Sequence, residues 1–566
     1  MSKKKKKKSW KEIQRERQIK QQRAQAAHQA RRERKPRQWP KGKVLVAVCL
    51  IALIVGAYLV WQYIKPLEEP PPQSGVIYIR ADGSVDPSNA SILNVGNVSY
   101  TFTADIHDSI VIERDNIVVD GANYSLQAVG DSTSDGIDLT GRNNVTIRNI
   151  KIQGFGNGLH LEQSSDNTLS GNTVANNQFD GIYLSYSSSN TLSGNSITSN
   201  QFDGLHLELS SKNTLSENRI LNNHDDGAHL RNSSDNTLIG NTIANNNNSG
   251  VNLYSVSRTV LSQNDLTGAK DGVVLRYSSD NTLIGNTIAN NNNSGIYLYS
   301  VSHSVFSQND LTSNKDAIIL EYASDSILSD NTVANNDNSG IYLYSVSHSV
   351  FSQNDLTSNY YGIVLEQSSS NTLSGNTITS NQNGIVLYKS SYNSNYYNNF
   401  IDNARQVYSN ESTNVWDDGY PSGGNYWSDY NGTDLLSGLY QNETGKDGIG
   451  DTAYIINASN TDHYPLIGTF HSFNVTLENV QTICNSTISD FQFNGTAISF
   501  NVIGEDGTTG FCRIRIPTAL MNDTFRVFVN DTEILPPPEP LLFSNSTHNY
   551  LYFTYNHSTR KIVIMS

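Results

Sequence analysis

Cysteine is scarce in this chain, with only three residues in 566. Cys49 lies inside a long apolar run near the N-terminus, so Cys484 and Cys512 are the natural partners for one disulfide bond. That bond is expected if the C-terminal part of the chain lies in an oxidising compartment. Methionine is equally rare, with three residues, so soft sulfur ligands for a metal are few.

Helix-forming stretches are lacking over residues 110–400. This region has no apolar spacing of helical period and almost no runs of Ala, Glu or Lys. Leucine and β-branched residues stand instead among Asn, Ser, Thr, Asp and Gly. The composition therefore argues against helices, including the helical parts of a leucine-rich repeat.

Positive charge is concentrated at the N-terminus. Residues 1–43 contain 18 Lys and Arg against three Glu, whereas the rest of the chain contains 21 Lys and Arg against 50 Asp and Glu. Residues 44–64 then carry no charged side chain. As a helix they would measure about 31 Å, enough to span a membrane, and the preceding basic excess predicts a cytoplasmic N-terminus.

These features predict a basic cytoplasmic tail (1–43), an uncleaved transmembrane signal-anchor helix (44–64) and a proline-rich stalk (65–75). A cleaved signal peptide is the alternative, but no clean cleavage site follows Ile64. A basic run beside a span is more typical of a topology signal than of a nucleic-acid arm, so the expected partner is the membrane. Sequons at Asn89, Asn410 and Asn485 fit a glycosylated external surface of a prokaryotic cell.

Glycine recurs every 22 or 23 residues through the middle of the chain. The interval is the length of one coil of a parallel β-helix and is too short for a propeller blade. Each unit reads N-T-L-x-x-N-x-I, a polar turn and G-I-x-L-x, which gives alternating strands. The series is Gly136, Gly158, Gly181, Gly204, Gly227, Gly250, Gly272, Gly295, Ala317, Gly340, Gly362 and Gly384.

The predicted fold is all-β, with a right-handed parallel β-helix of about 12 coils over residues 76–400. Leu169, Val174, Ile182 and Leu184 are expected to point inward. Turn asparagines one coil apart, namely Asn172, Asn195, Asn218 and Asn241, are expected to form amide ladders. Residues 401–469 are expected to cap the coil, and residues 470–566 to form a small β-sandwich-like domain.

Several segments resemble the NosD-like family of right-handed β-helix proteins, particularly its archaeal cell-surface members. They are "IYIRADGSVDPSNASI", "SIVIERDNIVVDGANYSL", "GGNYWSDYNGTD", "DGIGDTAY" and "DHYPL", and the resemblance extends over roughly residues 76–468. It implies a fold shared with carbohydrate-binding and sugar-hydrolysing proteins. The family name comes from a protein linked to copper supply for nitrous oxide reductase. Because a fold does not fix a function, each implied function has to be judged by the residues that it would require.

An enzyme interpretation uses stacked acids in the coils from Gly158 to Gly227. Carboxylates one or two coils apart would lie about 5–10 Å from each other, a range that suits glycosidases, and in a lyase they could hold Ca²⁺. The residues are Asp180, Asp203, Asp226, His206, Glu208 and Arg231. Because Asp before Gly is also an ordinary turn pair, a polysaccharide lyase or hydrolase is the alternative function.

A binding interpretation uses outward tyrosines in the second half of the coil. Their flat faces could stack on sugar rings, while charged neighbours hydrogen-bond hydroxyl groups. The residues are Tyr254, Tyr297, Tyr299, Tyr342, Tyr344 and Tyr388, with Arg276 and Glu321. Aromatic residues also favour strands and stack across coils for stability alone, so a structural spacer stays open.

Two metal interpretations are weaker. His160, His206 and His229 share a column that Tyr183 interrupts, so copper is not favoured. In the acidic glycine-rich segment, Asp434, Asp447 and Asp451 could gather round Ca²⁺, although an EF-hand spacing is missing. The sequence thus favours a membrane-anchored surface protein that binds polysaccharide without chemistry.

Overall fold

The computed structural model describes residues 75–130, 132–522, 524–534 and 541–566. The predicted tail (1–43), the transmembrane helix (44–64) and all but the last residue of the stalk lie outside these residues. Within the described ranges, no helix is long and apolar enough to cross a membrane.

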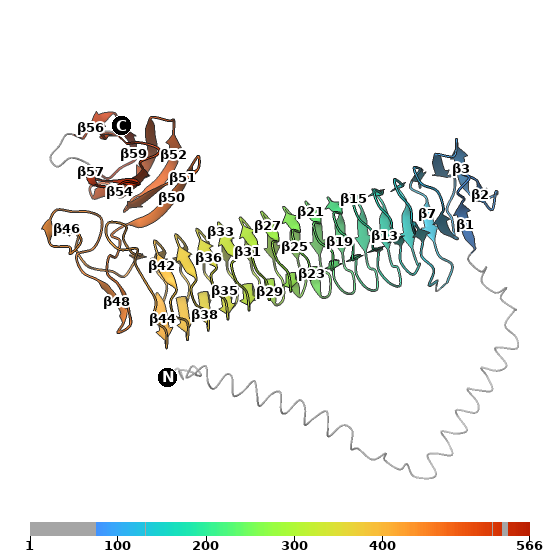
Figure 1. Cartoon of the computed structure of the whole chain (residues 1–566), viewed down its shortest axis with the longest axis horizontal. Helices are drawn as coiled ribbons and strands as arrows, with labels where there is room; N and C mark the ends of the chain where they lie inside the picture. The colour runs from blue at the N-terminus through green and yellow to red at the C-terminus, as the bar shows by residue number, and fades with distance from the viewer. Residues whose placement is uncertain (1–74, 131, 523, 535–540) are drawn as a thin grey trace, which may run out of the picture. The chain divides into compact units, whose positions relative to one another are not determined.

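Residues from Val76 to Trp427 wind into a coil whose turns stack along one axis, so that each turn adds one strand to each of three sheets (Figure 1). Neighbouring strands pair in parallel, apart from the antiparallel pairs β1–β2 and β3–β4 at the start. The sheets have 16, 15 and 14 strands, which corresponds to about 14 turns. The predicted number of about 12 is too low because the end coils, such as those of β1, β5 and β44, lack the marker glycine.

We call the 16-stranded sheet the face sheet. Its strands, in spatial order, are β2 (Val85–Asp86), β1 (Val76–Ile79), β5 (Ser109–Ile112), β8 (Ile137–Asp138), β11 (Leu159–Glu162), β14 (Ile182–Ser185), β17 (Leu205–Glu208), β20 (Ala228–Arg231), β23 (Ser249–Tyr254), β26 (Asp271–Arg276), β29 (Ser294–Tyr299), β32 (Asp316–Glu321), β35 (Ser339–Tyr344), β38 (Tyr361–Glu366), β41 (Asn383–Tyr388) and β44 (Val407–Asn410).

The second sheet contains β3 (Ile92–Val95), β4 (Ser99–Phe102), β6 (Val118–Asp120), β9 (Thr146–Arg148), β12 (Thr168–Ser170), β15 (Thr191–Ser193), β18 (Thr214–Ser216), β21 (Thr237–Ile239), β24 (Val260–Ser262), β27 (Thr282–Ile284), β30 (Val305–Ser307), β33 (Ile327–Ser329), β36 (Val350–Ser352), β39 (Thr372–Ser374) and β42 (Ser394–Tyr396). The third contains β7 (Ser125–Gln127), β10 (Lys151–Gln153), β13 (Thr173–Ala175), β16 (Ser196–Thr198), β19 (Arg219–Leu221), β22 (Thr242–Ala244), β25 (Asp265–Thr267), β28 (Thr287–Ala289), β31 (Asp310–Thr312), β34 (Thr332–Ala334), β37 (Asp355–Thr357), β40 (Thr377–Thr379), β43 (Asn399–Ile401) and β45 (Tyr426–Trp427).

The coil interior is apolar, as predicted. Leu169, Val174, Ile182 and Leu184 are all fully buried. Each pairs in register with its equivalent one coil later, for example Leu169 with Leu192. Stacking therefore converts thin apolar layers, which could not be stable alone, into one continuous core.

Asparagine ladders close the turns between the sheets, and this prediction is confirmed. From Asn172 to Asn264, each side-chain Nδ2 donates to the Oδ1 of the asparagine one coil later over 2.9–3.1 Å. The backbone N–H of each donates to the same oxygen over 2.9–3.0 Å. Buried turn backbone, which could not otherwise find partners, is satisfied in this way.

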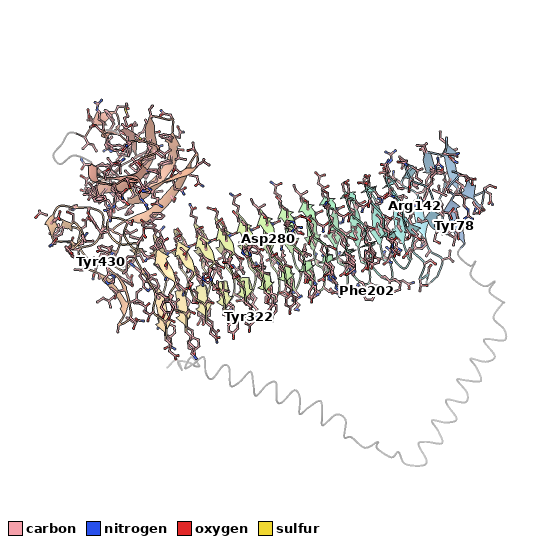
Figure 2. The ribbon with its side chains drawn as sticks, in the orientation of Figure 1. Tyr78, Arg142, Phe202, Asp280, Tyr322 and Tyr430 are labelled. Atoms are coloured by element: carbon pink, nitrogen blue, oxygen red, sulfur yellow. The ribbon has the colours of Figure 1, made fainter. Side chains whose placement is uncertain are left out.

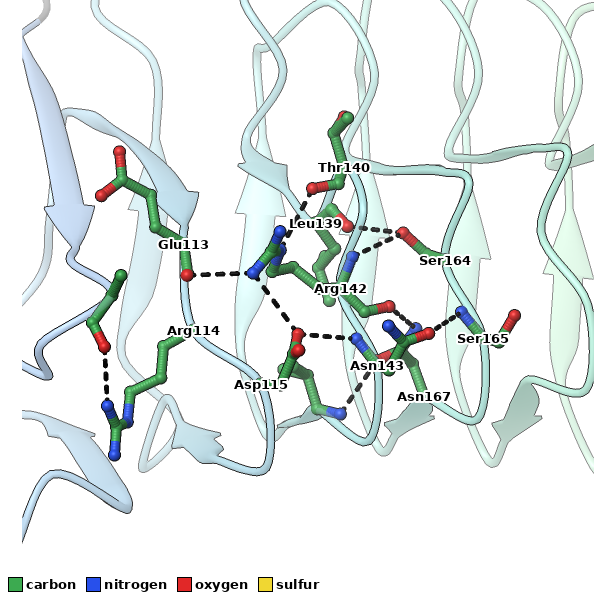
Figure 3. Close-up of polar contacts among 12 residues, drawn as sticks. Glu113, Arg114, Asp115, Leu139, Thr140, Arg142, Asn143, Ser164, Ser165 and Asn167 are labelled. Carbon is green, nitrogen blue, oxygen red and sulfur yellow. Dashed lines mark hydrogen bonds and ion pairs between the residues drawn. The ribbon is translucent and has the colours of Figure 1, made fainter.

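Charged side chains stand before the first residue of a second asparagine ladder, which runs through Asn167 and Asn190 (Figure 3). Asn167 Nδ2 donates to the backbone oxygen of Arg142 over 3.0 Å. One coil earlier, Asp115 Oδ1 accepts the backbone N–H of Asn143 over 3.0 Å and lies 3.4 Å from the Arg142 guanidinium. That guanidinium also donates to the backbone oxygen of Glu113 over 3.0 Å. Polar groups at this end are therefore satisfied by Asp115 and Arg142, together with Asn116 of the preceding coil, whose Oδ1 accepts the side-chain amide of Asn144 over 2.8 Å.

Aromatic residues cap the C-terminal end of the coil. The Trp427 ring stacks on Phe400 with centroids 4.2 Å apart, and both are buried. Asp462 Oδ2 accepts the indole N–H of Trp427 over 2.9 Å and the backbone N–H of Asn425 over 2.8 Å. The segment after β45 adds two hairpins, β46 (Leu436–Ser437) with β47 (Glu443–Thr444), and β48 (Tyr454–Asn457) with β49 (Asn460–Asp462).

The C-terminal domain consists of two five-stranded antiparallel sheets with one shared apolar cluster. The first has the order β50 (Thr469–Val475), β51 (Glu478–Cys484), β54 (Thr509–Pro517), β58 (His548–Asn556) and β57 (Leu541–Ser544). The second has the order β52 (Thr487–Phe493), β53 (Ala497–Ile503), β59 (Arg560–Met565), β55 (Arg526–Val529) and β56 (Thr532–Glu533).

The predicted disulfide bond is not formed. Cys484 and Cys512 lie directly opposite each other on β51 and β54, but both are free, buried thiols. The Cys484 thiol donates to the backbone oxygen of Phe511 over 3.0 Å and lies 3.2 Å from the Tyr555 hydroxyl. Its sulfur is thus oriented by these polar partners.

Candidate ligand-binding face of the coil

The outward positions of the face sheet form two rows in strict register. The row two residues after the marker glycine pairs His160 with Tyr183, then His206 and His229. The row two residues further on carries Glu208, Arg231, Tyr254, Arg276, Tyr299, Glu321, Tyr344, Glu366 and Tyr388. Residues far apart in sequence therefore become neighbours on one surface.

The first half of the face sheet carries a stack of rings, His160, Tyr183, His206 and His229, which we call the imidazole column. Successive ring centroids are 5.4, 5.1 and 4.8 Å apart. His206 and His229 lie nearly parallel, with 14° between their planes. Tyr183 separates His160 from His206 only. His206 and His229 are direct neighbours, so the interruption noted in the sequence does not affect these two imidazoles.

The predicted acids lie beside this column. Asp180, Asp203 and Asp226 are 9%, 4% and 2% exposed. Asp180 Oδ1 accepts the backbone N–H of Asp203 over 2.9 Å, and Asp203 Oδ1 accepts that of Asp226 over 2.9 Å. One carboxylate oxygen of each residue thus supports the next coil, and the second oxygen lies near the histidines.

Electrostatics couple these groups. Burial raises the pKa of Asp203, and the charges of Asp180 and Asp226 add to the effect. Burial lowers the pKa of His229, but its hydrogen bond to Asp203 and the surrounding carboxylates outweigh burial and leave the pKa raised. The arrangement favours a proton or another cation between the acids and the imidazoles.

Glu208 and Arg231 complete the predicted catalytic set. The Arg231 Nε lies 3.7 Å from Glu208 Oε2, and the side-chain amide of Asn232 donates to Glu208 Oε1 over 3.2 Å. Arg231 is more than half exposed. The structure therefore brings all six predicted residues to three adjacent coils.

The second half of the face sheet carries five stacked tyrosines, Tyr254, Tyr277, Tyr299, Tyr322 and Tyr344, which we call the tyrosine ladder. Successive centroids are 5.4–5.5 Å apart, and every pair is edge-to-face. Tyr322 lies along the edge of the coil that strands β29 and β35 occupy (Figure 2). There is one ring for each coil from Tyr254 to Tyr344.

Sequence reasoning missed Tyr277 and Tyr322. Each follows the last strand residue, Arg276 or Glu321, and has a left-handed backbone with φ of 52° or 55°. Their rings enter the gaps between Tyr254, Tyr299 and Tyr344. The signal was available, since Tyr recurs 45 residues apart in "LRYSSD" and "LEYASD".

Polar groups lie beside the ladder. The Tyr297 hydroxyl donates to Glu321 Oε2 over 2.8 Å, and the Tyr342 hydroxyl donates to Glu366 Oε2 over 2.8 Å. Burial and these carboxylates raise the pKa of both tyrosines. The Arg276 guanidinium lies 5.6 Å from the Tyr297 ring.

Tyr388 lies apart from the ladder, because Gln367 occupies the intervening turn position. The Lys389 ammonium is 5.2 Å from the Tyr388 ring. The predicted ligand-binding residues therefore fall into one continuous group, from Tyr254 to Tyr344, and one outlying tyrosine.

The acidic loop holds its carboxylates by backbone donors. Asp434 accepts the N–H groups of Asp447 and Gly448 over 3.0 and 3.1 Å, and Asp451 accepts that of Leu436 over 2.9 Å. Burial raises the pKa of Asp434 to about 6. Among the described residues, the potential metal-binding groups do not include these three, and calcium there stays a prediction.

Comparison with known families identifies the coil. Residues 135–288 match the model described as right handed beta helix region, which defines the class of the protein. Residues 248–432 match the model described as periplasmic copper-binding protein (NosD). Together these matches cover residues 135–432, and over this region the coil matches the NosD-like family of right-handed parallel β-helix proteins. The resemblance seen in the sequence is confirmed.

Solved structures with coils of this kind are distant. The Azotobacter vinelandii mannuronan C-5 epimerase AlgE6 A-module has 12% identity and a TM-score of 0.34, over 56% of this chain and 88% of its own. The Dettilon tailspike protein has 13% identity and a TM-score of 0.39, over 87% and 93%. The periplasmic alginate epimerase AlgG has 13% identity and a TM-score of 0.31, over 61% and 84%. Such low scores do not bear on ligand or activity.

No curated protein sequence matches the chain.

Proposed function

We propose that the chain binds an extended polysaccharide along the outer surface of the face sheet, centred on the tyrosine ladder. The observation that carries this proposal is the unbroken series of five rings, one for each coil, over about 19 Å along the coil. Tyr277 and Tyr322 are 53% and 51% exposed. Exposed aromatic rings in a row offer a sugar chain repeated apolar contacts.

Hydrogen-bonding groups lie where such a ligand would need them. Glu321, Glu366 and Arg276 alternate with the tyrosines in the same outward row. Carboxylates accept hydrogen bonds from sugar hydroxyls, and the guanidinium donates them. Because Tyr297 and Tyr342 hold Glu321 and Glu366 in place, these carboxylates are preorganised for binding.

The proposal includes presentation at the cell surface. The basic tail, the uncharged run and the stalk of the sequence support an anchor with the coil outside. An extracellular coil would meet envelope, matrix or neighbouring-cell glycans. Protease shaving of intact cells tests this: an external coil is digested, whereas an internal one is protected.

Polysaccharide cleavage at the coils of Asp180, Asp203 and Asp226 is the second candidate function. The raised pKa of Asp203 favours it, since a carboxyl that holds its proton more tightly than usual suits a general acid. Each acid, however, also accepts a backbone N–H and so has a structural role. Release of oligosaccharides by the wild type, abolished in Asp203→Asn, would establish cleavage.

Glycan-array binding by the full chain tests the main proposal. The double variant Tyr277→Ala and Tyr322→Ala removes the two half-exposed rings, and we expect binding to weaken about tenfold or more, about 1.4 kcal/mol. The matched control is Tyr186→Ala with Tyr392→Ala, two exposed tyrosines outside the ladder, which are 59% and 80% exposed. Equal loss in both pairs, or no glycan binding by the wild type, contradicts the proposal.

A further inference from the structure

His206 is a half-buried histidine without a close hydrogen-bond partner. Its Nδ1 lies 3.3 Å from Asp180 Oδ2 and 3.5 Å from Asp203 Oδ2. Its Nε2 is buried and has no hydrogen-bond partner among the described residues. By contrast, His160 in the same column donates from Nδ1 to Asp135 over 2.8 Å. A buried polar atom that lacks a partner requires an explanation.

The next coil supplies a second imidazole. His229 Nδ1 lies 3.2 Å from Asp203 Oδ2 and 3.9 Å from Asp226 Oδ2. Asp203 Oδ2 therefore lies between two imidazole nitrogens. The ligand atoms of Asp203, His206 and His229 all lie within 4.8 Å of one another.

These separations suit a four-coordinate metal ion. Bonds of about 2.1 Å to nitrogen and oxygen in a tetrahedron place neighbouring ligand atoms about 3.4 Å apart. Asp203 Oδ2 lies 3.2 Å from His229 Nδ1 and 3.5 Å from His206 Nδ1, which is close to this spacing. The His229 contact is also a hydrogen bond in the absence of an ion, whereas His206 Nδ1 is farther from both of its acids than the 2.8 Å of the His160 pair.

The carboxylate is also held as metal ligands usually are. Asp203 Oδ1 accepts the backbone N–H of Asp226 over 2.9 Å, which fixes the direction of the other oxygen. Such outer contacts orient ligands and raise affinity. The coil thus preorganises the cluster before any ion arrives.

We propose that Asp203, His206 and His229 form a binding site for a divalent transition-metal ion of the Zn²⁺ type. Two imidazoles and one carboxylate match the ligand preference of such ions, whereas Ca²⁺ and Mg²⁺ prefer oxygen alone. The site lies outside residues 248–432, which match the NosD model, so it does not rest on that match. It is also independent of the tyrosine ladder.

Metal titration of the chelator-treated full chain tests this proposal. We use Co²⁺, whose visible absorption reports tetrahedral coordination, and Zn²⁺ in calorimetry. We expect one equivalent of either ion to bind, with intense tetrahedral bands that Zn²⁺ abolishes, and the melting temperature to rise on binding.

Matched variants separate this site from other histidines. His206→Gln and His229→Gln should each weaken binding about 100-fold and remove the tetrahedral bands. His160→Gln, in the same column, and His224→Gln, which is exposed, should leave both unchanged. Circular dichroism establishes that each variant keeps the coil.

Three outcomes would overturn the proposal. They are no binding of Co²⁺ or Zn²⁺, binding that the His206 and His229 variants retain, and preferential binding of Ca²⁺ or Mg²⁺. None of them affects the polysaccharide proposal, whose test uses other residues.

Discussion

The two halves of the face sheet have the same interior and different exteriors. Leu207 in the first half and Leu298 in the second occupy equivalent inward positions and are both fully buried. Outward, the first half carries histidines and acids, and the second carries tyrosines with Glu321 and Glu366. The inward residues and turn asparagines therefore determine the coil, whereas the outward rows can change without altering it. Large effects on stability are expected inside and small ones outside.

The largest effect is expected from breaking an asparagine ladder. Asn246 Oδ1 accepts the backbone N–H and the side-chain amide of Asn223, both over 3.0 Å, and its Nδ2 donates to the Ile220 oxygen over 3.3 Å. Asn246→Ala leaves these groups buried without partners, so the free energy of unfolding should fall by about 3 kcal/mol. Urea unfolding followed by circular dichroism measures it.

The neighbouring residue is the control. Asn247 is exposed, and its part in the coil is a backbone hydrogen bond to Asn223. Asn247→Ala should change the free energy of unfolding by less than about 0.5 kcal/mol. If the two substitutions cost the same, the ladders do not determine the fold.

A smaller effect is expected within the tyrosine ladder. Tyr299 makes edge-to-face contacts with Tyr277 and Tyr322, both at 5.5 Å. Tyr299→Ala removes both contacts and should lower the free energy of unfolding by about 1–2 kcal/mol. Tyr186→Ala in the first half removes an exposed ring outside the ladder and should have little effect. A stability loss in Tyr299→Ala without loss of glycan binding would make the ladder purely structural.

The halves should also differ in their response to pH. The hydrogen bond to Asp135 raises the pKa of His160 above its ordinary value, although burial opposes it. The His160–Asp135 pair thus makes its full contribution to the free energy of unfolding below about pH 6.5. This contribution is lost as the pH rises through the folded-state pKa of His160. The Tyr297–Glu321 pair in the second half does not titrate there, because the tyrosine pKa is raised.

Melting temperatures of His160→Gln and Tyr297→Phe between pH 5 and 9 check this difference. The first should reduce the wild-type decline in melting temperature with rising pH, and the second should retain it. Retention of the full decline in His160→Gln would contradict the prediction.

The smallest effect is expected from exchanging outward residues between the halves. Arg231 lies opposite Tyr254 in the same row and is more than half exposed. Arg231→Tyr should therefore change the free energy of unfolding by less than about 0.5 kcal/mol. A loss of several kcal/mol would show that the outward row helps to determine the coil.

Periodicity explains how much was predictable from the sequence. The coil, its inward residues and the Asn172 to Asn241 ladder could be predicted because each coil repeats the same pattern of inward apolar residues and turn asparagines. The extra end coils could not, since β1 and β44 lack the marker glycine. The strand register likewise predicted the outward columns. It did not predict the positions of the turn residues that follow the strands, so Tyr277 and Tyr322 were missed.

Contacts that depend on side-chain direction were also beyond the sequence. Cys484 is a free thiol whose contacts with Phe511 and Tyr555 come from other strands. The separation of His206 from its acids depends on how a ring is oriented between two coils. Such distances decide between a hydrogen bond and a metal ligand, and sequence spacing does not supply them.

The strands β29 and β35 have the same sequence, Ser-Gly-Ile-Tyr-Leu-Tyr, 45 residues apart. Recombination between such copies in the gene would remove or add two whole turns at once, leaving both ends of the rod intact. Each event would change the reach of the aromatic surface by about 10 Å. The length of the aromatic surface can thus change rapidly during evolution, because the added turns bring a hydrophobic core that already packs.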